Sequence, residues 1–116
     1  MRDILHRIDG PDGRALVLQV PNVLNHENAD SLFESAERWL PNRDDASAIL
    51  DFASVTLIST IGIAALLQIE DLCRQRGASF ALAAVPTRHL ALLKMLHLGD
   101  RFRTFATVED GLGAIG

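Results

Sequence analysis

The chain has 116 residues, 48% of them hydrophobic and 22% charged, with a formal net charge of −4 at pH 7. This length predicts a single domain, residues 1–116, with one hydrophobic core. The acidic balance argues against a nucleic-acid-binding protein, which needs a basic surface to neutralise phosphates. Cys73 is the single cysteine, which excludes an internal disulfide and a metal cluster with several cysteine ligands.

The sequence contains no segment suited to crossing a membrane. Residues 1–7 lack the long apolar core of a signal peptide. The longest apolar runs fall far short of the ~20 residues that a transmembrane helix needs. We therefore expect a cytoplasmic protein with no direct membrane insertion, which can still be a subunit of a membrane complex.

Five segments have the apolar runs and turn-forming borders that are typical of strands. In chain order they are residues 4–8, 14–20, 48–52, 79–85 and 102–105. The turn formers in residues 9–13 predict a tight loop, so the first two strands should pair antiparallel. The second, third and fourth segments are mostly apolar, which predicts strands buried on both faces of a sheet.

Four further segments predict helices, each with a residue near its start that commonly caps a helix N-terminus. These cap residues are Asn25, Ser59, Thr87 and Thr107. The first three helices should end near Leu40, Arg76 and Leu98, and the fourth runs toward the end of the chain. Helices that alternate with strands predict an α/β domain, with a mixed sheet of about five strands covered by about four helices.

Several features that can carry chemistry have simpler structural explanations. Residues 111–116 spell G-x-G-x-x-G, but no helix follows them, so we expect a frayed glycine-rich terminus and no bound cofactor. The four histidines lie on separate elements without the spacing of metal ligands, so we expect no metal site. Asp51 should hydrogen-bond a neighbouring loop, and Cys73 should lie in the core. With no catalytic motif left, we expect that the protein is not an enzyme.

The third strand leads into a helix that begins with two adjacent hydroxyl residues. Ser59 is a good N-cap, and Thr60 then occupies the first helical position. Several N–H groups in a first turn lack partners inside the helix, and the helix dipole is positive there. A phosphate on Thr60 would therefore find hydrogen-bond donors and a favourable field. Gly62 allows another surface to approach the first turn closely.

The stretch around this helix start resembles the central motif of the STAS domain family, which includes bacterial anti-sigma-factor antagonists. Members carry Asp-Leu-x-x-Val in a strand, followed by Asp-Ser-Ser-Gly-Leu or Ile-Ser-Ser-Ala-Gly-Leu. This chain has Asp51-Phe52-Ala53-Ser54-Val55, followed by Ile58-Ser59-Thr60-Ile61-Gly62-Ile63. Residues 20–25 and 92–99 are similar to two further family segments, and the order of elements is similar across nearly the whole chain.

The resemblance implies a single STAS-like domain that works as a phosphorylation switch. In the family the middle hydroxyl residue of the motif accepts the phosphate, which here is Thr60. The residues implied in partner binding are Asn25, Ser59, Thr60, Ile61 and Gly62. The implied partners are an anti-sigma factor that is also a histidine-kinase-like ATPase acting as a serine/threonine kinase, and a phosphatase. The resemblance further implies that the unphosphorylated protein binds the kinase and so frees a sigma factor.

The chain departs from the family pattern at four positions. Ser59 replaces an acidic residue, Thr60 replaces serine, Ile61 replaces a small residue, and Asn25 stands where aspartate is common. These departures keep a second reading open, in which the domain is a non-switching subunit of an ABC lipid-transport complex or of a signalling scaffold. A third reading, an enzyme or nucleotide binder, has no motif to support it. The sequence leaves the oligomeric state open.

Overall fold

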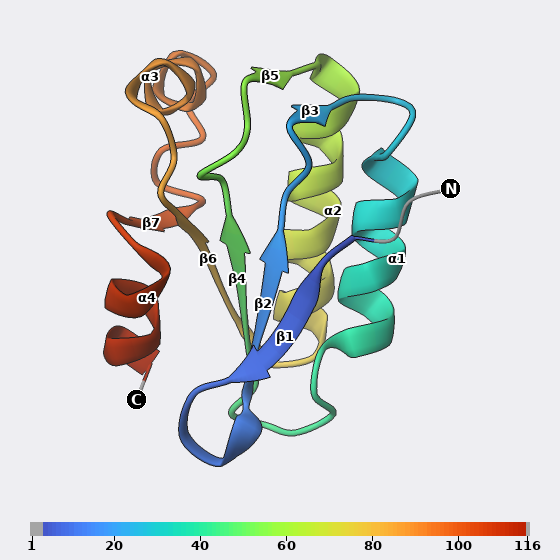
Figure 1. Ribbon diagram of the computed structural model, residues 1–116, viewed down its shortest axis with the longest axis vertical. Helices are drawn as coiled ribbons and strands as arrows, with labels where there is room; N and C mark the ends of the chain where they lie inside the picture. The colour runs from blue at the N-terminus through green and yellow to red at the C-terminus, as the bar shows by residue number, and fades with distance from the viewer. Residues whose placement is uncertain (1–3, 116) are drawn as a thin grey trace.

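A five-stranded mixed sheet forms the centre of the computed structural model, which describes residues 4–115 (Figure 1). Its strands, in spatial order, are β1 (His6–Asp9), β2 (Ala15–Gln19), β4 (Ser47–Asp51), β6 (Ser79–Ala83) and β7 (Arg103–Phe105). The first pair is antiparallel and the other three pairs are parallel. A short 3-10 turn, η1 (Pro11–Gly13), joins β1 to β2. The predicted fold class is therefore confirmed.

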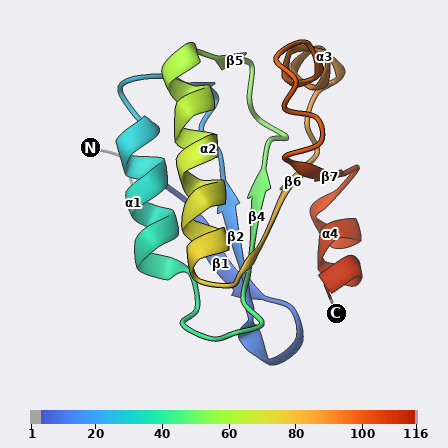
Figure 2. The ribbon, with the colours of Figure 1, turned by 180° about the vertical axis from the view of Figure 1, so that it is seen from behind.

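Helices cover both faces of the sheet. Seen from behind in Figure 2, α1 (Ala29–Trp39) and α2 (Thr60–Gln75) lie side by side on one face, and α4 (Val108–Ile115) lies on the other. The α3 helix (Thr87–Met95) lies beyond the carboxyl ends of the parallel strands. None of the helices in residues 4–115 is both long enough and apolar enough to span a membrane.

The sheet separates two apolar clusters because strand side chains alternate between its faces. Leu16 and Leu18 of β2 point into the large cluster under α1 and α2. Val17, between them, joins the small cluster that includes Val108 of α4. Residues 15–18 are buried throughout, so the predicted burial of this strand on both faces is confirmed.

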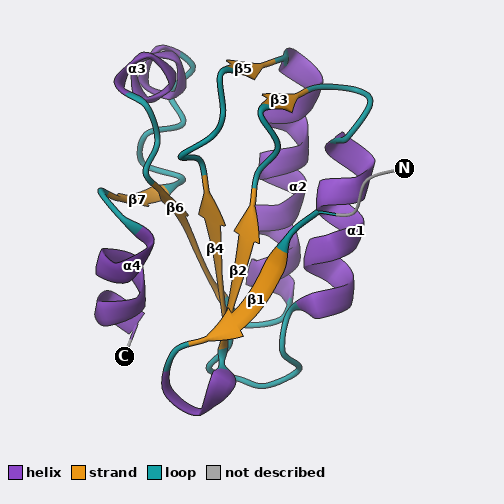
Figure 3. Cartoon of the chain, in the orientation of Figure 1, coloured by secondary structure: helices purple, strands orange, loops and turns teal. Residues whose placement is uncertain are grey.

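Two very short strands that were not predicted from the sequence form a separate ribbon. The β3 strand (Val23–Leu24) pairs in parallel with β5 (Leu57–Ile58), at the top of the molecule in Figure 3. The Thr56 N–H donates to the Asn22 carbonyl oxygen at 2.7 Å and fixes one end of the ribbon. Two residues are too few to show a period of two, so no apolar pattern marks these strands.

Three predictions about element ends are wrong. The α1 helix begins at Ala29 with Asn28 as its N-cap, because Asn25 Oδ1 instead accepts the Glu27 N–H in a turn before the helix. Thr87 is the first residue of α3, and Pro86 occupies the N-cap position. The glycine-rich end forms helix α4 up to residue 115, and Gly116 lies outside the described residues. Shorter differences in strand bounds are one to two residues.

Two other predictions are confirmed. The Asp51 carboxylate accepts the Ala53 N–H at 2.9 Å and so holds the loop that follows β4. Cys73 is buried among the residues of the large cluster. Burial raises the pKa of the Cys73 thiol to about 12, so the thiol stays protonated near neutral pH.

Cys73 should therefore resist thiol reagents until the protein unfolds. At about pH 8 a pKa near 12 leaves roughly one thiol in 10,000 ionised, and the thiolate is the reactive form. We expect a disulfide reagent such as DTNB to label native protein slowly and urea-unfolded protein rapidly. Fast, stoichiometric labelling of native protein would show that Cys73 is accessible.

Candidate functional site

The candidate site lies at the N-terminus of α2, where β5 ends. Ser59 has an extended backbone (φ −88°, ψ 171°), and its Oγ accepts the Gly62 N–H at 3.1 Å. The Ser59 carbonyl oxygen accepts the Ile63 N–H at 3.0 Å, which is the first hydrogen bond of the helix. Ser59 is thus the N-cap, as the sequence predicts, and its hydroxyl is occupied by the helix itself.

Thr60 is exposed on the first turn of α2. Within residues 4–115, no hydrogen-bond partner accepts the backbone N–H of Thr60 or of Ile61. The first turn also carries no acidic residue, so nothing local cancels the positive end of the helix dipole. The Thr60 hydroxyl is therefore an accessible group beside two available donors, a place where a negative charge is stabilised.

Gly62 is buried against the β3 strand of the same chain. A Cβ at this position would lie 2.6 Å from the Leu24 carbonyl oxygen and 2.9 Å from Leu24 Cγ. The surface that approaches the first turn closely at Gly62 is thus the protein's own Leu24. The Ser59 N–H donates to the same Leu24 oxygen at 2.9 Å, so both residues fasten α2 to β3.

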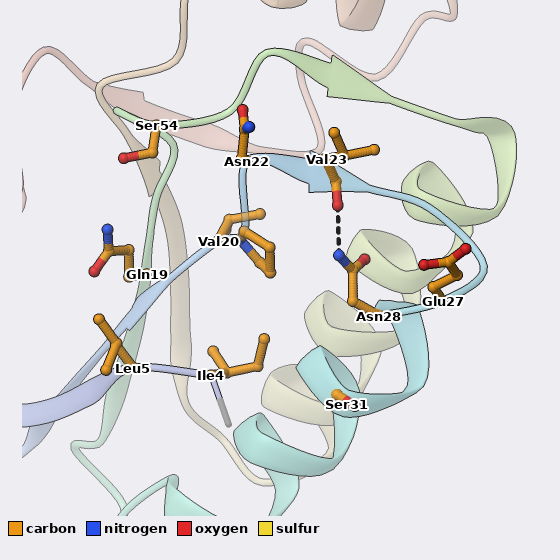
Figure 4. Close-up of a pocket in the computed structure, with 11 residues that line it drawn as sticks. Ile4, Leu5, Gln19, Val20, Asn22, Val23, Glu27, Asn28, Ser31 and Ser54 are labelled. Carbon is orange, nitrogen blue, oxygen red and sulfur yellow. Dashed lines mark hydrogen bonds between the residues drawn. The ribbon is translucent and has the colours of Figure 1, made fainter. Parts of the chain in front are cut away.

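Asn25 lies beside Ser59 because the parallel ribbon places Leu24 opposite Ile58, one residue earlier on each strand. Asn28 holds the turn around Asn25. Its Oδ1 accepts the Asn25 N–H at 3.0 Å, and its Nδ2 donates to the Val23 carbonyl oxygen (Figure 4). The structure therefore brings Asn25, Ser59 and Thr60 to the same end of the molecule on well-anchored backbone.

Two exposed apolar residues lie close to Thr60 in the chain, and only one of them was singled out from the sequence. Ile61 is 54% exposed, so it points away from the core, and Leu57 of β5 is 59% exposed. We call Leu57, Thr60 and Ile61 the α2 rim. Arg88 at the start of α3 donates to the Thr56 carbonyl oxygen at 3.0 Å, which holds α3 near the rim. Leu57 was missed because an exposed leucine in a two-residue strand leaves no periodic signal.

A groove of about 550 Å³ lies below the β3 strand (Figure 4). Its walls come from the segment before β1, the end of β2 and the residues that follow it, the start of α1 with the turn before it, and the loop after β4. The lining residues are Ile4, Leu5, Gln19, Val20, Pro21, Asn22, Val23, Glu27, Asn28, Ser31 and Ser54. None of the α2 rim residues lines it. In the described part of the chain, no group of three or more His, Cys, Asp or Glu residues could hold a metal ion.

Comparison with known proteins places this geometry in a family. The family model described as "STAS domain" matches residues 7–111. An anti-sigma-factor antagonist (STAS) domain protein from Planctomyces limnophilus has a similar fold, with a TM-score of 0.85, 15% identity, and coverage of 98% of each chain. An anti-sigma factor antagonist from Mycobacterium paratuberculosis matches with a TM-score of 0.72 and 17% identity, over 97% of this chain and 94% of the other. A sulfate transporter family protein from Wolinella succinogenes matches with a TM-score of 0.77 and 18% identity, over 92% of this chain and 88% of the other.

We expect Gly62→Ala to destabilise the protein by about 1–3 kcal/mol, because the new methyl group would overlap the Leu24 backbone and force α2 away from β3. Urea unfolding measures the change. Gly113→Ala is the matched control, since it also lies in a helix but has no atom within 4 Å of the added Cβ. There the change should stabilise by roughly 0.5–1 kcal/mol. Equal effects at both positions would contradict tight packing at Gly62.

Ser59→Ala and Thr60→Ala should differ although the residues are adjacent. Loss of the Ser59 cap leaves the Gly62 N–H without its acceptor and should lower the free energy of unfolding by about 1 kcal/mol. The exposed Thr60 side chain makes no such bond, so its removal should change stability by less than about 0.5 kcal/mol. The same urea titrations test both, and a larger loss at Thr60 would contradict the assigned roles.

Proposed function

The chain belongs to the STAS domain family, and we propose that it is a cytoplasmic, non-enzymatic anti-sigma-factor antagonist controlled by phosphorylation of Thr60. In the unphosphorylated form the α2 rim binds an anti-sigma factor that is also a serine/threonine kinase of the histidine-kinase-like ATPase type. That binding frees a sigma factor for transcription. A phosphatase reverses the phosphorylation, and ATP is bound by the kinase, so this chain needs no cofactor.

The observation that carries the proposal is the exposed Thr60 residue at the positive end of α2, close in the chain to the exposed apolar residues Leu57 and Ile61. Such a face can bury Leu57 and Ile61 against a partner. Full burial of an apolar side chain of this size is worth about 1.5–3 kcal/mol. The hydroxyl is small enough to remain inside the contact, and a kinase that binds the face is in reach of it.

Phosphorylation would change the same face from apolar to strongly charged. A phosphate adds about −1.5 to −2 charges, which would have to lose water inside the contact. In the free protein, the unpartnered N–H groups of Thr60 and Ile61 stabilise the phosphate. This stabilisation favours the free protein over the complex with the partner. A loss of about 2.7 kcal/mol already weakens binding ~100-fold. The face is therefore suited to a switch between bound and free states.

A second candidate is a non-switching subunit of a membrane transport complex or a signalling scaffold. The similarity in fold to the Wolinella succinogenes sulfate transporter family protein favours this reading, as does the bulk of Ile61 beside Thr60. Co-purification separates the two functions. Recovery of a transporter ATPase supports the second candidate, and recovery of a kinase of the histidine-kinase-like type supports the first.

Thr60 should be the single site that the kinase modifies. Incubation of the purified chain with its co-purified kinase and ATP should add one phosphate, which mass spectrometry should place on Thr60. Ser59→Ala should still accept the phosphate, and Thr60→Ala should not. A phosphate on Ser59, or no phosphate with an active kinase, would overturn the assignment.

The charge should also weaken the partner complex. We expect Thr60→Glu to bind the kinase about 100-fold more weakly than the wild type, which corresponds to roughly 2.7 kcal/mol. Thr60→Val is the matched control because it keeps the branched shape without a charge, and it should bind within a few-fold of the wild type. Calorimetric titration measures both. Equal affinity for Thr60→Glu and the wild type would contradict a switch at this residue.

A further inference from the structure

The β1 strand forms one edge of the sheet and has an accessible side. Within residues 4–115 it pairs with β2 alone. Two apolar residues in or beside it are exposed, Leu5 at 67% and Ile8 at 45%. Figure 1 shows β1 low on the molecule, whereas the N-terminus of α2 lies at its top, so this edge is separate from the α2 rim. Exposed edges of this kind pair readily with another strand.

The hydrogen-bond ladder shows which backbone groups of β1 face outward. The Gln19 N–H donates to the Leu5 carbonyl oxygen at 2.9 Å, so these two residues form a hydrogen-bonded pair. Hydrogen-bonded pairs alternate along an antiparallel ladder. With His6 opposite Leu18 and Ile8 opposite Leu16, the bonded residues on β1 are Leu5, Arg7 and Asp9. The N–H and C=O groups of His6 and Ile8 therefore point away from β2.

We infer that β1 pairs antiparallel with β1 of a second copy of this chain, with Ile8 opposite Ile8 at the two-fold axis. Several registers place outward-facing residues of the two β1 strands opposite one another. Among them, this register has the most favourable pairing of charged side chains. Pairing His6 with Ile8 would set Arg7 against Arg7, and pairing Ile8 with Gly10 would set Asp9 against Asp9. With Ile8 opposite Ile8, each Arg7 faces an Asp9 of the other copy. Opposite charges across strands stabilise, and like charges destabilise.

The side chains on both faces of the strand suit this contact. Arg7 and Asp9 already form an exposed ion pair at 3.2 Å within one chain, so the same groups can join a four-charge cluster across the axis. Ile8 points to the other face, where the two copies would bury it against each other. On the same face His6 stacks on Trp39, with ring centroids 4.1 Å apart, so an ordered pair of rings lies next to Ile8.

The alternating pattern Arg7-Ile8-Asp9 is complementary to itself under two-fold rotation, which favours a second copy over an unrelated strand. His6 pairing with His6 would instead leave each Arg7 without a carboxylate opposite. The contact joins two sheets into one continuous sheet through three residues of each copy, Arg7, Ile8 and Asp9. Because both α2 rims lie away from the axis, the dimer leaves them accessible.

Sedimentation equilibrium over a range of concentrations tests the dimer. We expect the wild type to self-associate, and both Arg7→Asp and Asp9→Arg to raise the dissociation constant ~10-fold or more, since each sets like charges opposite one another. The double variant, Arg7→Asp with Asp9→Arg, should restore the dimer, and an equimolar mixture of the single variants should form a heterodimer. Arg103→Asp, an equal charge change on the opposite edge strand β7, should have no effect.

A disulfide test reports the register independently. In a Cys73→Ala background, Ile8→Cys should cross-link two copies under mild oxidation, because hydrogen-bonded pairs have Cα atoms about 5.5 Å apart, within disulfide range. Arg7→Cys should not cross-link, since its counterpart lies two residues away. A folded wild type that stays monomeric up to ~1 mM would overturn the proposal. So would preferential cross-linking through position 7, or a folded double variant that fails to dimerise.

Discussion

The contact between Gly62 and Leu24 is the constraint on which the functional end of the molecule depends. No side chain separates the first turn of α2 from the β3 backbone, so the Leu24 carbonyl oxygen can accept the Ser59 N–H at 2.9 Å. That hydrogen bond sets where α2 begins. The start of α2 then determines that Ile63 points into the core while Ile61 and Thr60 point outward. The exposure of Thr60 is thus a consequence of how Gly62 packs against Leu24.

The same constraint explains what could and could not be predicted from the sequence. Ser59 as N-cap follows from local chemistry, because a serine before an apolar helical repeat has few better places for its hydroxyl. The β2, β4 and β6 strands are long apolar runs that only burial on both faces satisfies. Gly62, by contrast, owes its role to Leu24, which lies far away in the sequence. No local pattern in the sequence indicates a contact between two residues so far apart in the chain.

The wrong prediction of where α1 begins has a related physical origin. Asn25 and Asn28 are both suitable N-caps by residue type, and the choice between them depends on tertiary structure. Asn28 takes that position because its amide also bridges to the Asn25 N–H and the Val23 carbonyl oxygen, which ties the turn to β3. The β3 and β5 strands exist for similar reasons. Their two-residue pairing is imposed by the loops that connect β2 to α1 and β4 to α2.

The sheet gives the two proposed surfaces separate positions, and that separation has a consequence for binding. The α2 rim lies at the carboxyl ends of the parallel strands, while β1 lies along one lateral edge. In the proposed dimer two α2 rims belong to one particle, and phosphorylation of one rim leaves the other apolar. A partner that is itself dimeric would then gain affinity from the second contact through effective concentration. Release of such a partner would require phosphate on both rims, so the dimer would make the switch respond more steeply to kinase activity than a single domain can.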